Sequence, residues 1–117
     1  MGSGNKYDLE ERTYQFAKDI RLFIKHVPKT LTNVDDCKQL GRSSGSVGVN
    51  YIEANEAVSR KDFIYRIKIC RKEIKESRLF LKLIDTGMEN DEPKHQLINE
   101  AIELEKIFGA IIRNSSD

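Results

Sequence analysis

The chain has 117 residues, which is enough for one domain with one modest hydrophobic core. Charged residues make up 33% and apolar residues 38%, a balance that excludes a disordered chain, and no apolar run reaches the roughly 18–20 residues that a membrane-spanning helix needs. The cysteines form no CxxC pair, so we expect two buried thiols, Cys37 and Cys70, rather than a disulfide framework or a zinc site. The start of the chain has no signal-peptide core, so we expect a cytoplasmic protein. We expect a single domain over residues 1–117, in which residues 1–6 are a flexible tail or a cloning remnant.

The first two predicted helices are marked by an apolar stripe and by a helix-start signal. Six residues from Leu9 to Val27 recur every three or four positions and predict a helix over residues 7–27, which Pro28 closes. The segment Thr32–Asp35 (TNVD) resembles a capping box, whose side chains satisfy the free amides of a helix start. It predicts a second helix over residues 33–57.

The third and fourth predicted helices have similar signals. Ser59–Asp62 is a second capping box and opens a helix over residues 60–86 with a near-heptad apolar seam, which Gly87 is placed to end in a left-handed turn. Asn90–Pro93 supplies acidic caps and a first-turn proline for a helix over residues 92–114. No segment alternates as a strand does, and short connections favour antiparallel neighbours. The sequence therefore predicts an all-α, antiparallel up-down-up-down four-helix bundle.

The second predicted helix contains an unusual glycine-rich segment, Gly41–Gly48 (GRSSGSVG). It lacks the lysine and the spacing of a Walker phosphate loop, and no strand precedes it as in a dinucleotide-binding loop. On a helix, four of its small residues share one face, and a face almost without side chains lets a neighbouring helix approach closely. We assign a helix-packing role to Gly41, Ser44, Gly45 and Gly48.

A polar row runs along the same helix and consists of Arg42, Ser46, Asn50 and Glu53. Two interpretations are open. The row is either a solvated face, or a partly buried network in which Glu53 neutralises Arg42 or a neighbouring lysine and Asn50 bonds across the bundle. Buried polar rows fix helix register and partner choice more than they add stability.

The net charge of +1 conceals an uneven distribution. Residues 59–90 carry nine Lys or Arg against five acids, whereas residues 91–117 carry three against six. Bases clustered on one helix face indicate a contact with a phosphate backbone. Two alternatives have the same composition. The face is solvated and carries i,i+4 ion pairs, or it docks on the acidic fourth helix of another subunit. The candidate nucleic-acid-binding residues are Lys61, Lys68, Arg71, Lys72, Lys75, Arg78 and Lys82.

No constellation for catalysis is found in the sequence. His26 and His95 lack the spacing of metal ligands, the acidic pairs fit helix caps and ordinary helical charge, and no serine or cysteine has a base at motif spacing. We therefore expect no catalytic, cofactor-binding or metal site, no small-molecule substrate and no enzymatic activity.

The segment Gln39–Ile84 resembles the family of four-helix-bundle proteins encoded in intervening sequences of bacterial 23S ribosomal RNA genes. Members show Gln-Leu-x-Arg followed by small residues, then Asn-Ile-Ala-Glu-Gly, a Ser/Arg-rich turn and an amphipathic helix. The matching residues are Gln39, Leu40, Arg42, Ser46, Asn50 and Glu53, whereas Tyr51, Ile52 and Ala54 depart from the pattern.

This resemblance implies an architecture more firmly than an activity, because most of the family has no assigned role. The accessory protein of diversity-generating retroelements looks similar, and it implies a homopentameric, barrel-like assembly whose basic surface binds nucleic acid and a reverse transcriptase. We expect a non-enzymatic oligomeric module that contacts RNA or DNA through its third helix. The alternative is a protein–protein adaptor or structural assembly protein that binds no nucleic acid.

Apolar residues outside the helical seams also predict self-association. A bundle helix buries about three positions in seven, and apolar surface left over usually marks an interface. The surplus residues on the third and fourth predicted helices are Ile69, Phe80, Leu83, Ile98, Ile102, Ile107 and Ile112.

Overall fold

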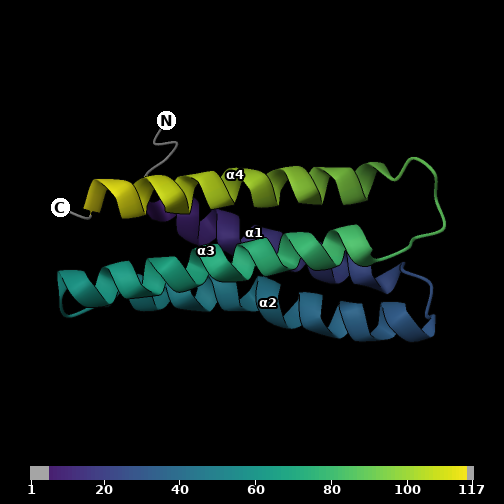
Figure 1. Cartoon of the computed structure of the whole chain (residues 1–117), viewed down its shortest axis with the longest axis horizontal. Helices are drawn as coiled ribbons and strands as arrows, with labels where there is room; N and C mark the ends of the chain where they lie inside the picture. Colours follow the sequence, from purple (N-terminus) through teal and green to yellow (C-terminus); the bar gives the residue numbers. More distant parts are fainter. Residues whose placement is uncertain (1–5, 116–117) are drawn as a thin grey trace.

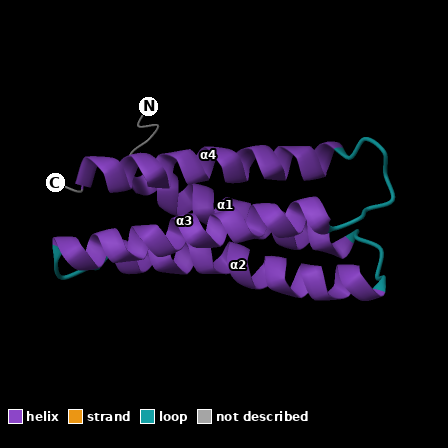
Figure 2. Cartoon of the chain, viewed as in Figure 1, coloured by secondary structure: helices purple, strands orange, loops and turns teal. Residues whose placement is uncertain are grey.

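The computed structural model describes residues 6–115, which form four helices (Figure 1). Helix α1 spans Lys6–Lys25, α2 spans Leu31–Asn55, α3 spans Arg60–Leu83 and α4 spans Glu92–Ser115. Successive helices run in opposite directions along the long axis of the molecule, and the described residues contain no strand (Figures 1 and 2). The predicted all-α, antiparallel four-helix bundle is confirmed. Residues 1–5 of the predicted tail lie outside the described residues, and Lys6 is already helical.

Two of the predicted helix starts have the expected caps. The Ser59 hydroxyl accepts a hydrogen bond from the Asp62 amide at 3.0 Å and opens α3. The Asp91 carboxylate accepts one from the Lys94 amide at 3.2 Å and opens α4. Each side-chain oxygen satisfies a backbone donor that has no partner within its helix.

The start of α2 differs from the prediction. Thr30, not Thr32, is the N-cap, and its hydroxyl accepts from the Asn33 amide at 3.3 Å. The buried Asn33 side chain donates to the carbonyls of Pro28 at 3.0 Å and Asp85 at 2.8 Å, and it accepts from the Asp85 amide at 3.1 Å. The capping box assigned to Thr32–Asp35 is therefore wrong, because Asn33 holds the helix start against the α3–α4 loop at the same end of the bundle (Figure 1).

The end of α3 also differs from the prediction. The helix stops at Leu83, and Ile84 turns to an extended backbone with φ −65° and ψ 127° while its side chain is fully buried. Gly87 has the expected positive φ of 76°, but it lies within the following loop and does not cap the helix. Burial of Ile84 and the hydrogen bonds between Asp85 and Asn33 end the helix earlier.

The core runs along the bundle axis and is built from the apolar stripe of each helix. Of the four pairs of neighbouring helices, α2 and α3 pack together most extensively and α1 and α4 least. Burying one large apolar side chain stabilises the fold by about 1.5–3 kcal/mol. No helix among residues 6–115 is long and apolar enough to cross a membrane. The largest fully buried apolar side chains are Phe16, Ile20, Leu40, Val47, Ile67, Ile74, Leu81, Ile84, Leu104 and Phe108.

Candidate nucleic-acid interface

The polar row of α2 lies along α3. Arg42 forms ion pairs with Glu76 at 2.9 Å and with Glu73 at 3.3 Å. Asn50 is buried, and its amide group donates to the Ser46 carbonyl at 2.9 Å and the Ser46 hydroxyl at 3.0 Å. Its carbonyl oxygen accepts from Arg66 of α3 at 3.1 Å. The row thus connects the two helices by polar contacts.

Glu53 does not take the role that the buried-network interpretation gives it. The residue is exposed, and α3 rather than Glu53 supplies the carboxylates that neutralise Arg42. Glu73, which the sequence reading missed, is the buried member of the network at 5% exposure, with Lys72 as a second cation at 3.4 Å. Its Oε1 atom makes no hydrogen bond and is held by charge alone. The sequence offers one sign of this burial, because Glu73 directly precedes Ile74 of the apolar seam.

The small-residue face of α2 is turned towards α1. A Cβ atom added at Gly45 would lie 3.2 Å from the Arg21 guanidinium, which donates to the Gly41 carbonyl at 3.3 Å. A Cβ atom added at Gly48 would lie 3.6 Å from the Thr13 hydroxyl. At Gly41 the nearest atom would be a methyl of Ile24 at 4.0 Å, and the buried Ser44 hydroxyl donates to the Gly41 carbonyl at 3.2 Å. Side chains of α1 thus approach all three glycines, closely at Gly45 and at ordinary contact distance, with room for a methyl group, at Gly41 and Gly48.

The basic residues of α3 are gathered unevenly. Lys61 and Lys82 are exposed near opposite ends of the helix, about 30 Å apart at the usual rise of about 1.5 Å per residue. Arg78 is turned to α4, where it pairs with Glu105 at 2.9 Å. The other four of the seven candidate residues line one shallow surface hollow of about 440 Å³, together with Glu76 and Leu79. These four exposed residues, here called the basic hollow, are Lys68, Arg71, Lys72 and Lys75.

The basic hollow keeps most of its charge available. Glu76 on its rim is paired with Arg42, and Lys72 lies 3.4 Å from Glu73. Within the part of the chain that the structure describes, Lys68, Arg71 and Lys75 have no carboxylate at ion-pair distance. Three such cations on about two turns of helix concentrate positive potential on one part of the surface.

A second hollow of about 280 Å³ continues the basic surface onto α4. Arg71 and Arg78 line it from α3, and Lys106 and Arg113 line it from α4. Gly109 forms part of its floor. The sequence reading counted the α4 bases only towards net charge, because nothing in the sequence shows that they lie beside α3.

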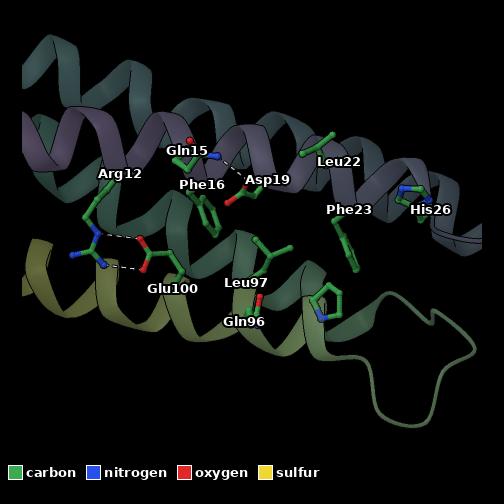
Figure 3. Close-up of a pocket in the computed structure, with 11 residues that line it drawn as sticks. Arg12, Gln15, Phe16, Asp19, Leu22, Phe23, His26, Gln96, Leu97 and Glu100 are labelled. Carbon is green, nitrogen blue, oxygen red and sulfur yellow. Dashed lines mark hydrogen bonds and ion pairs between the residues drawn. The ribbon is translucent and has the colours of Figure 1, made fainter.

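A different surface, the α1–α4 groove, is a wider hollow of about 590 Å³ (Figure 3). Phe16, Phe23 and Leu97 project into it from the two helices. Arg12 and Glu100 span it with two hydrogen bonds of 2.8 and 3.0 Å. The groove is apolar along its floor, and it exists because α1 and α4 pack loosely.

Comparison with known proteins shows the family of this chain. The model of the 23S rRNA-intervening sequence protein family matches residues 5–110. The chain belongs to this family. It is also similar to a crystal structure of a protein of unknown function from the S23 ribosomal protein family of Bacteroides thetaiotaomicron, with a TM-score of 0.80 and 28% identity over 92% of this chain and 97% of that one.

A curated relative matches a smaller part of the chain. Centromere protein S of Bos taurus is 30% identical over 77 residues, which are 66% of this chain. The chain spans about half of that protein's length, 56%.

Two of the three departures from the pattern of the intervening-sequence family lie in the core. Tyr51 is buried, its ring centroid lies 6.2 Å from that of Phe108, and burial raises the pKa of its hydroxyl. Ala54 is also buried, whereas Ile52 is 55% exposed. Tyr51 thus contributes a ring contact with α4 at one of the positions where the motif varies.

The two thiols of this family member lie in different environments. Cys70 is buried, donates to the Val47 carbonyl at 3.5 Å, and has its pKa raised to about 12 by burial. Cys37 is half-buried, and burial, assisted by the Asp36 charge, raises the pKa of its thiol too. Among residues 6–115, no three His, Cys, Asp or Glu side chains are placed to hold a metal ion.

Proposed function

We propose that this member of the 23S rRNA-intervening sequence protein family is a non-enzymatic, self-associating helical module that binds the backbone of RNA or DNA through α3. The observation that carries the proposal is the basic hollow. Lys68, Arg71 and Lys75 surround it, and none of them has a carboxylate at ion-pair distance among residues 6–115. Phosphate groups would neutralise these cations and release condensed counterions, which favours binding to any sequence. Flanking contacts with phosphate groups, or additional positive electrostatic potential, would come from Lys61, Arg78 and Lys82.

The charges of α4 favour nucleic acid over an adaptor role. Docking of the acidic α4 on the basic α3 of another subunit would need free carboxylates. Instead, Glu100 pairs with Arg12, Glu105 pairs with Arg78, and Glu103 lies 3.8 Å from Lys106 within the same chain. These contacts engage three of the carboxylates of α4 within the chain, which disfavours such docking.

Self-association is the second part of the proposal. Leu79 and Leu83 of α3 are 51% and 56% exposed, and the α1–α4 groove adds a further apolar surface. The other surplus apolar residues predicted from the sequence are half-buried. By resemblance to the accessory protein of diversity-generating retroelements, the proposed assembly is a homopentamer, whose five α3 helices would reinforce one positive field and present it to nucleic acid and to a reverse transcriptase.

The proposal is tested by filter binding of a structured RNA across a salt series, with light scattering on the same samples. We expect measurable binding at low salt that weakens with a steep log–log slope, and a mass about five times that of the 13.5 kDa chain. A slope near zero contradicts the nucleic-acid interface, and a monomer mass contradicts the assembly.

A charge-reversal variant separates the adaptor alternative. In Lys68→Glu/Lys72→Glu/Lys75→Glu we expect loss of RNA binding with the oligomer intact. The alternative outcome has two parts: the wild type binds no RNA, and the variant folds but no longer assembles. That outcome identifies the basic hollow as a protein-binding surface.

A further inference from the structure

Two guanidinium groups from different helices converge above Gly109. A Cβ atom added at this glycine would lie 3.5 Å from Nη1 of Arg113 and 3.8 Å from Nε of Arg71. Arg113 is one turn further along α4 and folds back over the glycine, as helical side chains do, while Arg71 reaches across from α3. The missing side chain leaves a space that both cations face.

The described carboxylates near these two cations are paired with other bases. The hollow around Gly109 contains four bases and one carboxylate, Glu105. Glu105 is used by Arg78 at 2.9 Å, and Lys106 has Glu103 at 3.8 Å. Among the described residues, neither Arg71 nor Arg113 has a carboxylate partner. Two unpaired guanidinium groups held near one point repel each other, and an anion between them would relieve that repulsion.

We propose that Arg71, Arg113 and the bare backbone of Gly109 form a seat for one phosphate group of a bound nucleic-acid backbone. This inference rests on the proposed function and extends the interface from α3 onto α4. A phosphate oxygen accepts charge-assisted hydrogen bonds from guanidinium groups at about 2.7–2.9 Å, and two such groups hold its orientation as well as its charge. The absent Gly109 side chain leaves a methyl-sized space beside both groups, and one phosphate oxygen would occupy it.

Arg113 has a competing structural explanation. It lies in the last turn of α4, where the helix dipole stabilises a cation whatever lies nearby. That explanation does not account for Gly109. A glycine inside a helix costs about 1 kcal/mol relative to alanine, and the helix dipole gives no reason for this cost. A substitution at Gly109 that leaves every charge in place therefore distinguishes the two.

The test is Gly109→Ala, with Gly41→Ala as the matched control. Both added methyl groups meet only ordinary contact distances, of 3.5 Å or more, so both variants should fold with a melting temperature equal to or above that of the wild type. Binding is measured by fluorescence anisotropy with labelled oligouridylate across a KCl series. We expect Gly109→Ala to bind about tenfold more weakly, and Gly41→Ala to bind as the wild type does. Equal affinities of Gly109→Ala and the wild type overturn the seat while leaving the basic hollow intact.

Arginine variants add an independent readout. If Arg71 and Arg113 hold one phosphate, then Arg71→Gln, Arg113→Gln and the double variant should each lower the salt slope by about the same amount, close to the value of about 0.7 for one single-strand contact. A double variant that lowers the slope by the sum of both singles means two separate contacts, and it overturns the shared seat.

Inorganic phosphate tests the seat without nucleic acid. Titration with phosphate, monitored by NMR, should shift the Gly109 amide and the Arg71 and Arg113 Nε resonances of the wild type in a saturable way, and not those of Gly109→Ala. No saturable shift overturns the seat even where the chain binds RNA. Saturable phosphate binding with RNA affinity unchanged in Gly109→Ala assigns the site to free phosphate and overturns the backbone contact. If the wild type binds no RNA, the proposed function fails, and the backbone seat fails with it.

Discussion

Replacement of Arg42 by glutamine tests how the α2–α3 network is held together. The change leaves the Glu73 carboxylate, which is 5% exposed, with Lys72 at 3.4 Å as its remaining cation. Removing one partner of a fully buried ion pair costs about 3–5 kcal/mol. The Arg42 side chain is 51% exposed and Lys72 stays in place, so solvent screening reduces the expected loss to about 1–2 kcal/mol in the free energy of unfolding.

The same substitution in a Glu73→Leu background should cost much less. Replacing a buried charged residue by an apolar one of similar volume is often neutral or stabilising, and it removes the carboxylate that needs Arg42. Only the partly exposed pair with Glu76 is then lost, at about 0.5 kcal/mol.

Urea denaturation of the four proteins of this cycle measures the coupling, provided that all four share one m-value. We expect a coupling free energy of about 1 kcal/mol. An Arg42→Gln cost that is equal in the two backgrounds would refute the view that Glu73 depends on Arg42.

Three further substitutions probe the packing, the loops and the interior thiol. Gly48→Leu should lower the free energy of unfolding by about 1–3 kcal/mol, because Thr13 already occupies the adjacent space, whereas Gly48→Ala should raise it; equal urea midpoints for both variants would contradict the packing. Asn33→Ala removes three hydrogen bonds to Pro28 and Asp85 and should cost about 2–4 kcal/mol by the same assay, and a loss below that of one hydrogen bond would contradict the bridge between the loops. Burial raises the Cys70 pKa from 9.0 to about 12, so the protonated thiol stabilises the fold fully below pH 9. This contribution is lost as the pH rises towards 12. The free energy of unfolding of Cys70→Ala, measured against pH, should lack that decline.

The fold followed from the sequence because its signals are local and periodic. The stripe from Leu9 to Val27 and the seam of α3 each bury one face of a helix, and a helix needs nothing beyond such spacing to choose its inner face. The start of α2 did not follow, because Thr30 and Thr32 are both good caps. The choice between them is made by Asn33 and its partner Asp85, which is distant in the sequence.

The candidate interface was predictable along one helix and not across two. Lys68, Arg71, Lys72 and Lys75 share a face at helical spacing, and the structure groups them in one hollow. The approach of Arg113 to Arg71 depends on how far α4 is shifted along α3, and that register is set by packing of the whole bundle. Glu73 was missed for a related reason, since its burial depends on the position of Arg42 on another helix.

The measurement that tests the nucleic-acid interface most directly compares two neutralised variants with the same net charge. Lys68→Gln/Arg71→Gln/Lys75→Gln removes the uncompensated cations of the basic hollow, and Lys25→Gln/Lys29→Gln/Lys38→Gln removes three exposed lysines outside α3. In RNA binding across a salt series, the first variant should lose about two units of the log–log slope and most of its affinity, while the second keeps the wild-type slope. Equal slopes for the two variants would show that only net charge matters and would contradict an interface on α3.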